Sequence, residues 1–132
     1  MKTLKEIQEY ITQTIQHLDW NKAPRGLYEP IEYTLEGGGK RVRPALLLLT
    51  ASMYNANLEE ATAAAMAVEI FHNFTLLHDD VMDKSDTRRG RQTVHIKWNE
   101  NTAILSGDQM MIEAYSQIAK LSADKLKKVL PL

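Results

Sequence analysis

The feature that most constrains the fold is the absence of proline and glycine from Leu58 to Met82. These two residues interrupt helices most strongly, whereas alanine, leucine, methionine and glutamate, in which this segment is rich, favour them. The sequence therefore predicts one long helix over this range. Its alanines allow neighbouring helices to approach closely.

Three shorter helices are predicted before the long one. In residues 3–19, apolar side chains recur at spacings of three and four, which is the period of an amphipathic helix. Residues 21–26 contain Pro24 and form a break, and a short helix follows over residues 27–35. After three glycines, a further helix is expected over residues 41–54.

The last quarter of the chain is expected to return to helix near Asn101. Gly107 and Asp108 interrupt the apolar pattern of this helix, and Gly107 is expected to mark close packing against a neighbour. A last short helix is predicted over residues 122–130, with Ser122 at its start. The residues expected to form the core stripe of the longer helix are Ile104, Leu105, Ile112, Tyr115, Ile118 and Ala119.

The composition narrows the class of protein. The chain has 132 residues, no cysteine and a formal net charge of −1, which indicates one domain or part of one. Near-neutral charge argues against non-specific nucleic-acid binding, so no nucleic-acid partner is expected. The longest apolar run, Ala45 to Leu49, is far too short to cross a bilayer, and MKTLKEIQEY has no apolar signal core. We expect no transmembrane segment and a reducing, cytoplasmic location.

Three aspartates in a DDxxD arrangement stand at the end of the long helix, at Asp79, Asp80 and Asp83. Asp79 and Asp83 share a helix face one turn apart. Carboxylates about 6 Å apart repel by about 0.7 kcal/mol in water and about 3 kcal/mol at an effective dielectric of about 20. A hard cation such as Mg²⁺, which one or two carboxylates usually hold together with waters and phosphates, would remove this repulsion. The alternative is a solvated acidic helix end.

A basic segment follows the aspartates at once. Arg88 and Arg89 carry planar charge suited to bidentate phosphate contact, and Arg91 follows them closely. Gly90 permits a tight turn beside them. The acid and the base together indicate a site for a metal ion and a diphosphate, although a solvated basic loop that balances nearby acids remains the alternative.

A second anion site is indicated upstream. Gly37, Gly38 and Gly39 end a helix and leave backbone N–H groups free to approach an anion. The basic residues at 40, 41 and 43 follow, and Pro44 suits the first turn of the next helix, whose N-terminus carries partial positive charge. The GxxxxGK[ST] spacing of a Walker A loop is missing. The alternative is a flexible linker with solvated charges.

Histidines near the aspartates have less certain roles. His72 lies seven residues before Asp79 and therefore shares its helix face, although spacing alone favours a core residue there. His78 is adjacent in sequence but lies off that face, and we expect it to pack or to support the site.

Four motifs occur in order: GGGKRVRP at 37–44, HNFTLLHDDVMD at 72–83, RRGRQTVH at 88–95 and SGDQM at 106–110. Together they resemble the N-terminal half of an all-trans polyprenyl diphosphate synthase, the family of farnesyl and geranylgeranyl diphosphate synthases. The resemblance covers nearly the whole chain. It implies an all-α fold, an isoprenoid-synthase-type helical bundle in which long helices surround a deep apolar cavity.

The resemblance also implies a reaction, the condensation of isopentenyl diphosphate with an allylic diphosphate. The allylic diphosphate departs with the help of Mg²⁺, and the isopentenyl double bond attacks the resulting cation. By motif, Asp79 and Asp83 would bind Mg²⁺ with Asp80 in support, and Arg88 would bind the allylic diphosphate. These four are the predicted catalytic residues. The residues expected to bind isopentenyl diphosphate are Lys40, Arg43, His72 and Arg89.

One departure from the family pattern concerns the second half of the site. The family has a second aspartate-rich motif on a later helix, and none occurs in this chain. We therefore expect residues 1–132 to be the N-terminal half of a synthase domain that is inactive alone. Such a half should expose apolar surface, which makes a homodimer or a domain-swapped oligomer the expected state.

The product and two alternatives complete these expectations. An aromatic residue five positions before the first aspartate, here Phe74, resembles short-chain synthases, most closely those that make a geranylgeranyl product. By helix counting, however, Thr75 lies nearer to the face of Asp79 than Phe74 does. A class I terpene cyclase, which also uses DDxxD, and a non-catalytic partner subunit of a heteromeric prenyl synthase are the alternatives.

Overall fold

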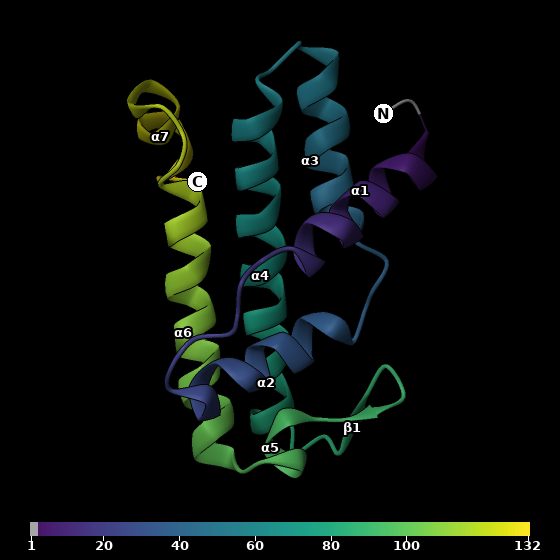
Figure 1. Ribbon diagram of the computed structural model, residues 1–132, viewed down its shortest axis with the longest axis vertical. Coiled ribbons are helices and arrows are strands. Elements are labelled where there is room, and N and C mark those ends of the chain that lie inside the picture. The colour runs from purple at the N-terminus through teal and green to yellow at the C-terminus, as the bar shows by residue number, and fades with distance from the viewer. Residues whose placement is uncertain (1–2) are drawn as a thin grey trace.

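The computed structural model describes residues 3–132 and contains seven helices and one two-stranded hairpin within that range (Figure 1). The expected all-α fold is therefore confirmed. The helices are α1 Leu4–Gln16, α2 Arg25–Glu36, α3 Val42–Met53, α4 Leu58–Met82, α5 Val94–Lys97, α6 Glu100–Ile118 and α7 Ala123–Val129, and the strands are β1 Thr87–Arg88 and β2 Arg91–Gln92.

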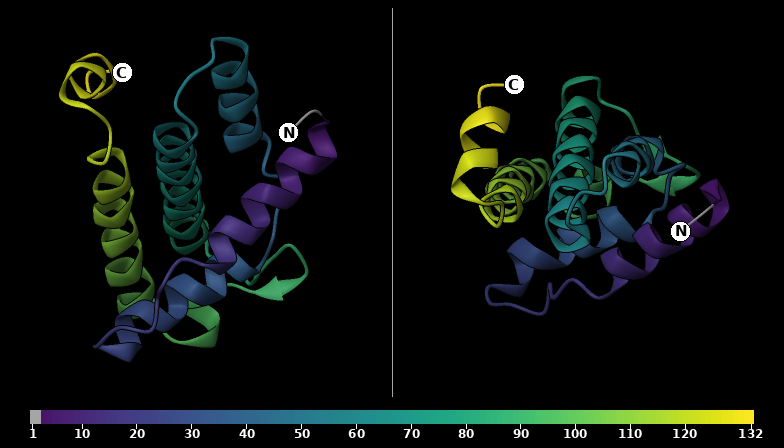
Figure 2. Two further views of the ribbon diagram at one scale, coloured as in Figure 1. Left: turned by 45° about the horizontal axis from the view of Figure 1, so that its top comes forward. Right: turned by 90° about the horizontal axis from the view of Figure 1, so that it is seen from above.

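The long helix α4 has the bounds that the sequence predicts. The side chain of Asn57 caps its N-terminus by accepting a hydrogen bond from the backbone N–H of Glu60 at 3.0 Å. Helix α4 lies between α3 and α6, and α1 and α2 cross one side of these three helices as a second layer (Figures 1 and 2). The hydrophobic core lies between the two layers and along α4.

The core is built from the periodic faces of these helices. Helix α1 contributes the isoleucines at 7, 11 and 15, as its amphipathic pattern predicts, and all three are buried. Leu4, on the same stripe, is 58% exposed, because it lies at the open end of the helix. The largest fully buried apolar side chains are Ile7, Ile11, Ile31, Leu35, Met66, Ile70 and Met110.

The predicted core stripe of α6 is wrong. Leu105, Ile112 and Tyr115 are 58, 53 and 55% exposed, and Ile104 and Ala119 are exposed as well. The buried face of α6 consists instead of mostly small residues, which pack against the alanine-rich side of α4. Small residues let the two backbones approach closely, so the large side chains of α6 stand on the opposite side. The buried residues of α6 are Ala103, Ser106, Gly107, Met110 and Ala114.

Gly107 marks the close approach that the sequence predicts. A Cβ atom at this position would lie 2.3 Å from Nε2 of His78, so only glycine fits without displacing that ring. His78 packs edge-to-face on Phe74 with 4.8 Å between ring centroids. Helix α6 continues through Gly107 and Asp108 without interruption.

The segment between α4 and α6 is more regular than the expected loop. Strands β1 and β2 form an antiparallel hairpin whose two turn residues, Arg89 and Gly90, have φ of 53° and 75°. Positive φ at both positions is the geometry of tight turns that match strand twist. The ring of Tyr33 on α2 holds this hairpin, because its hydroxyl donates to the carbonyl of Gln92 at 2.8 Å and the guanidinium of Arg91 lies 3.8 Å from the ring centroid.

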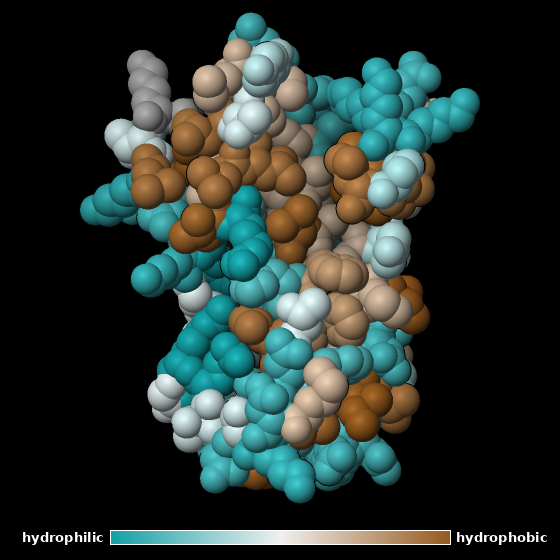
Figure 3. Space-filling view, turned by 180° about the vertical axis from the view of Figure 1, so that it is seen from behind, coloured by the Kyte–Doolittle hydropathy of each residue, from teal (hydrophilic) through white to brown (hydrophobic). Residues whose placement is uncertain are grey.

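The face opposite α1 and α2 gathers hydrophobic side chains in its upper part, on both sides of a groove (Figure 3). Exposed apolar residues of α3 include Leu46 and Met53, which are 57 and 74% exposed, and Tyr54, directly after the helix, is 80% exposed. The expected exposed apolar surface is therefore present. Within residues 3–132, none of the helices combines the length and apolarity needed to cross a bilayer.

Candidate active site

The aspartates at the C-terminal end of α4 divide into two kinds. Asp80 is buried and accepts hydrogen bonds from Nε of Arg88 at 2.8 and 3.0 Å and from its Nη2 at 2.9 Å. Asp79 and Asp83 are exposed, and neither side chain forms a hydrogen bond or ion pair within the described chain. Arg88 still has Nη1 available for an external anion.

Their position at a helix C-terminus makes these carboxylates electrostatically unfavourable. The last turn of α4 carries no basic residue, and the C-terminal end of a helix already carries partial negative charge. Arg88 compensates Asp80, and hydrogen bonding to Asp80 raises the pKa of Arg88. Asp79 and Asp83 form no hydrogen bond or ion pair within the described chain and interact with the charge of Arg88 only at longer range. A bound cation would remove the repulsion that remains between them.

Asp79 and Asp83 are the predicted metal donors, and both carboxylates are exposed. Across residues 3–132, no group of three or more histidine, cysteine, aspartate or glutamate side chains converges on one point. Carboxylate oxygens one helical turn apart fit Mg²⁺, which needs one or two such ligands when water and phosphate oxygens supply the rest. The donor chemistry therefore suits the predicted ion.

The glycine-rich connection between α2 and α3 lies against the hairpin. Gly38 and Gly39 have φ of 82° and 130°, and a Cβ atom on Gly39 would lie 2.8 Å from Nη2 of Arg89. Nη1 of Arg89 donates to the carbonyl oxygen of Gly38. Glycine is thus needed here for its backbone conformation and to admit the guanidinium.

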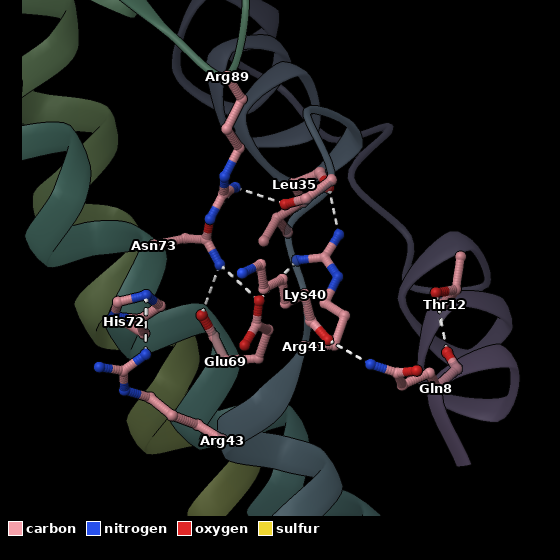
Figure 4. Close-up of polar contacts among 11 residues, drawn as sticks. Gln8, Thr12, Leu35, Lys40, Arg41, Arg43, Glu69, His72, Asn73 and Arg89 are labelled. Atoms are coloured by element: carbon pink, nitrogen blue, oxygen red, sulfur yellow. Dashed lines mark hydrogen bonds and ion pairs between the residues drawn. The ribbon is translucent and has the colours of Figure 1, made fainter. Parts of the chain in front are cut away.

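A basic pocket of about 440 Å³ lies between this connection, α4 and the hairpin. It brings together the four residues predicted to bind isopentenyl diphosphate. In Figure 4, the guanidinium of Arg43 lies against the edge of the His72 ring, with Nη1 of Arg43 3.3 Å from Nε2 of His72. The predicted residues in its lining are Lys40, Arg43, His72 and Arg89.

The charges of the pocket act on one another. Burial lowers the pKa of His72, and the positive charge of Arg43 lowers it further. Burial also lowers the pKa of Arg89, with Arg41 as the next cause. Burial is the larger cause of both pKa shifts, and the neighbouring positive charges are the second cause, which a bound anion would offset.

A buried polar network below this pocket is not among the predicted site residues. Arg41 donates from Nη1 to Oε1 of Glu69 at 2.6 Å, and their side chains are only 6 and 3% exposed. Asn73 donates from Nδ2 to the same Oε1 at 3.0 Å and accepts from Nη1 of Arg89 at 3.4 Å (Figure 4). Removing one member of such a buried pair typically costs about 3–5 kcal/mol. Their spacing is a sequence signal that could have found them, since Asn73 lies four residues after Glu69 and seven before Asp80, which places all three on one helix face.

An apolar groove of about 570 Å³ runs between α4 and α6. Phe71, His72 and Thr75 line it from α4, and Tyr115 is among the residues that line it from α6. Phe74 is absent from this lining and packs instead on Phe71 and His78, with 5.3 and 4.8 Å between ring centroids. The helix counting that placed Thr75 nearer the aspartate face agrees with this arrangement.

Comparison with known proteins gives consistent matches. Residues 24–131 match the family model described as polyprenyl synthetase. The geranylgeranyl diphosphate synthase of Methanosarcina mazei is 40% identical over 124 residues, which cover 94% of this chain and 38% of that protein. The short chain isoprenyl diphosphate synthase of Methanocaldococcus jannaschii is 42% identical over 99 residues, or 75% of this chain and 30% of that protein.

Solved structures agree with the sequence matches. A crystal structure of a geranylgeranyl pyrophosphate synthase superposes with a TM-score of 0.90 at 48% identity, over 97% of this chain and 39% of that one. The geranylgeranyl pyrophosphate synthetase of Geoglobus acetivorans gives 0.87 at 36% identity, over 95 and 42%. The chain thus spans less than half the length of these relatives. Their names give the alternative of a non-catalytic partner subunit no support.

Proposed function

Because the chain belongs to the polyprenyl synthetase family, we propose that it is the N-terminal half of a short-chain prenyltransferase. The complete protein would join isopentenyl diphosphate to an allylic diphosphate in the presence of Mg²⁺. The observation that carries this proposal is that α4 presents an exposed carboxylate pair at its C-terminal end and a basic pocket along its middle. Arg88, bonded to Asp80, lies near the pair, and Arg89 lines the pocket.

The allylic half of the site would use Asp79, Asp83 and Arg88. The two carboxylates would hold Mg²⁺, which when bound neutralises charge on the departing diphosphate. Asp80 orients Arg88 through its bidentate hydrogen bonds, and Nη1, which these bonds do not use, would donate to the same anion. A fixed donor placed where negative charge develops stabilises the transition state without reorganising.

The second substrate would lie in the basic pocket. Lys40, Arg43, His72 and Arg89 would bind the diphosphate of isopentenyl diphosphate there, as guanidinium and ammonium groups commonly do. Its double bond would then attack the allylic cation, and a proton would leave to the departing diphosphate. The apolar groove that contains Thr75 would take the growing prenyl chain.

The product we propose is geranylgeranyl diphosphate. The support is the naming of several relatives as geranylgeranyl diphosphate synthases and the aromatic Phe74 five residues before Asp79. We further propose that residues 1–132 alone do not condense the substrates, because one carboxylate pair supplies only one side of the metal site. The exposed apolar side chains favour self-association as a homodimer or a domain-swapped oligomer, and a cytoplasmic location fits this chemistry.

The test compares residues 1–132 with the product of the complete reading frame, each supplied with Mg²⁺, isopentenyl diphosphate and an allylic diphosphate. We expect chain growth only from the complete protein. In that protein, Asp79→Asn together with Asp83→Asn should lower kcat/KM by at least about a hundredfold, since each lost charged contact costs roughly 1.5–3 kcal/mol. The matched control is Asp86→Asn, which removes an exposed carboxylate of the adjoining loop. Hydrocarbon release in place of chain growth would instead identify a terpene cyclase, and an inactive complete protein would contradict the proposal.

A further inference from the structure

One acidic side chain lies at the floor of the otherwise basic pocket. Glu69 lines this pocket together with Arg41 and the four cationic or imidazole side chains described above. Its carboxylate is 3% exposed and is bonded to both Arg41 and Asn73. A carboxylate at this place opposes anion binding unless its charge is neutralised, so a role other than direct contact with the anion must account for Glu69 in this pocket.

Through Arg41, Glu69 fixes the glycine-rich connection. Arg41 has φ of 54°, a left-handed conformation that is unfavourable for a residue other than glycine. Its guanidinium is nevertheless held on two sides, by Glu69 and by the carbonyl oxygen of Leu35 at 2.8 Å. Lys40 precedes Arg41 in sequence, and its own carbonyl oxygen accepts from Nε2 of Gln8 at 2.8 Å (Figure 4). The backbone that presents Lys40 and Arg43 is thereby held at the residue between them and from α1.

Through Asn73, Glu69 also reaches the hairpin. Nδ2 of Asn73 donates to the backbone oxygen of Glu69 at 2.9 Å and to its carboxylate at 3.0 Å. These two bonds fix the amide orientation, because they leave Oδ1 as the acceptor that faces Arg89. Arg89 is also a left-handed residue, with φ of 53°. Figure 4 shows its guanidinium pointing down from the hairpin toward Asn73.

We propose that Glu69 and Asn73 are positioning residues for the isopentenyl diphosphate site. They hold the two basic segments, one before α3 and one at the hairpin turn, at a fixed separation across α4. The inference rests on the function proposed above and adds to it the residues that set the geometry of its second diphosphate pocket. Neither residue needs to touch the substrate for this role.

Stability alone would not require this arrangement. A buried ion pair is often replaced by apolar residues of similar size at little cost or with a gain in stability. Here the pair connects a strained residue of one substrate-binding segment to an amide that contacts the other. The arrangement therefore separates two roles: loss of Asn73 should loosen Arg89 while the Arg41–Glu69 pair is left in place.

The experiment uses the complete protein and three variants. Asn73→Leu removes the relay to Arg89, and Arg41→Met combined with Glu69→Leu removes the ion pair without leaving a buried charge. Glu60→Gln is the matched control, because Glu60 also forms an ion pair from α4, with Lys125, but at the opposite end of the helix. Steady-state kinetics with each substrate varied in turn are combined with calorimetric titration of isopentenyl diphosphate in the absence of the allylic substrate.

We expect Asn73→Leu to raise KM and the calorimetric Kd for isopentenyl diphosphate about tenfold. The KM for the allylic diphosphate should change by less than about twofold, and the double variant should follow the same pattern. The control should match the wild type in both constants. Equal rises in both KM values, or a wild-type Kd for isopentenyl diphosphate in Asn73→Leu, would overturn the positioning role while leaving the proposed reaction standing. An inactive wild type that binds no isopentenyl diphosphate would instead refute the reaction, and the positioning role with it.

Discussion

Replacing Gly107 by alanine tests the packing of α6 on α4 beside the site. The new Cβ atom would lie 2.3 Å from Nε2 and 2.5 Å from Cδ2 of His78, distances at which the ring must move. The ring has little freedom to do so, because Nε2 lies 3.1 Å from the carbonyl oxygen of Ile104 and the ring packs on Phe74. The substitution therefore forces a clash inside a packed helix pair.

Two opposing terms set the magnitude. Overpacking a well-filled contact typically costs about 1–3 kcal/mol, whereas Gly→Ala in a helix interior gains up to about 1 kcal/mol. We expect Gly107→Ala to destabilise the protein by about 0–2 kcal/mol. In a His78→Ala background the clash is absent, and the same change should stabilise by about 1 kcal/mol.

Equilibrium urea denaturation of the wild type, the two single variants and the double variant measures this coupling. Gly26→Ala in α2 is the matched control, since a Cβ atom there meets nothing within 4 Å, and it should not destabilise. The reasoning is refuted if Gly107→Ala stabilises the protein to the same extent with and without His78, because the contact between the new Cβ atom and the His78 ring would then have no effect on the free energy of unfolding.

Further predictions concern the polar site and the groove. Burial lowers the pKa of His72 in the folded protein from its usual 6.5. As the pH falls below 6.5, the unfolded chain therefore binds a proton at this residue before the folded protein does, and the free energy of unfolding should decrease. In urea titrations at several pH values, His72→Gln should make this pH dependence weaker. Asp80→Asn removes the partner of Arg88 and should destabilise by about 1.5–3 kcal/mol, whereas Asp83→Asn, which loses no internal contact, should be neutral or stabilising in the same assay. Thr75→Phe should shorten the prenyl product identified by chromatography, because Thr75 lines the apolar groove; an unchanged product would show that the chain grows elsewhere.

The sequence was sufficient where local signals decide the structure. The bounds of α4 follow from its unbroken run of helix-forming residues and its asparagine cap. The motifs also identified side chains that the fold brings to one pocket from three separate elements, since Lys40, His72 and Arg89 all line it. The hairpin at residues 87–92 was missed because its strands are two residues long and carry no alternating apolar pattern.

The stripe on α6 shows why periodicity alone can select the wrong face. Ile104, Ile112 and Tyr115 do recur on one side of the helix, so an apolar face exists there as predicted. A repeating pattern does not say which neighbour covers that face. The contact with α4 is made instead by residues such as Ala103 and Gly107, whose small size matches the alanines opposite. In close helix contacts, small side chains can carry the interface and leave the large ones outside.

Helix α4 joins the two levels of the site, because it carries two adjacent polar stripes. The outer stripe holds His72, Asp79 and Asp83, which face the substrates in the proposed reaction. The inner stripe holds Glu69, Asn73 and Asp80, all buried and each bonded to an arginine of a neighbouring segment. The inner stripe accepts hydrogen bonds from arginines, and the outer stripe carries the proposed ligands. Because both stripes belong to one rigid helix, the arginines and the ligands are held at fixed distances from one another. Substitutions on the inner stripe should therefore alter substrate affinity through the arginines, whereas those on the outer stripe should remove direct contacts.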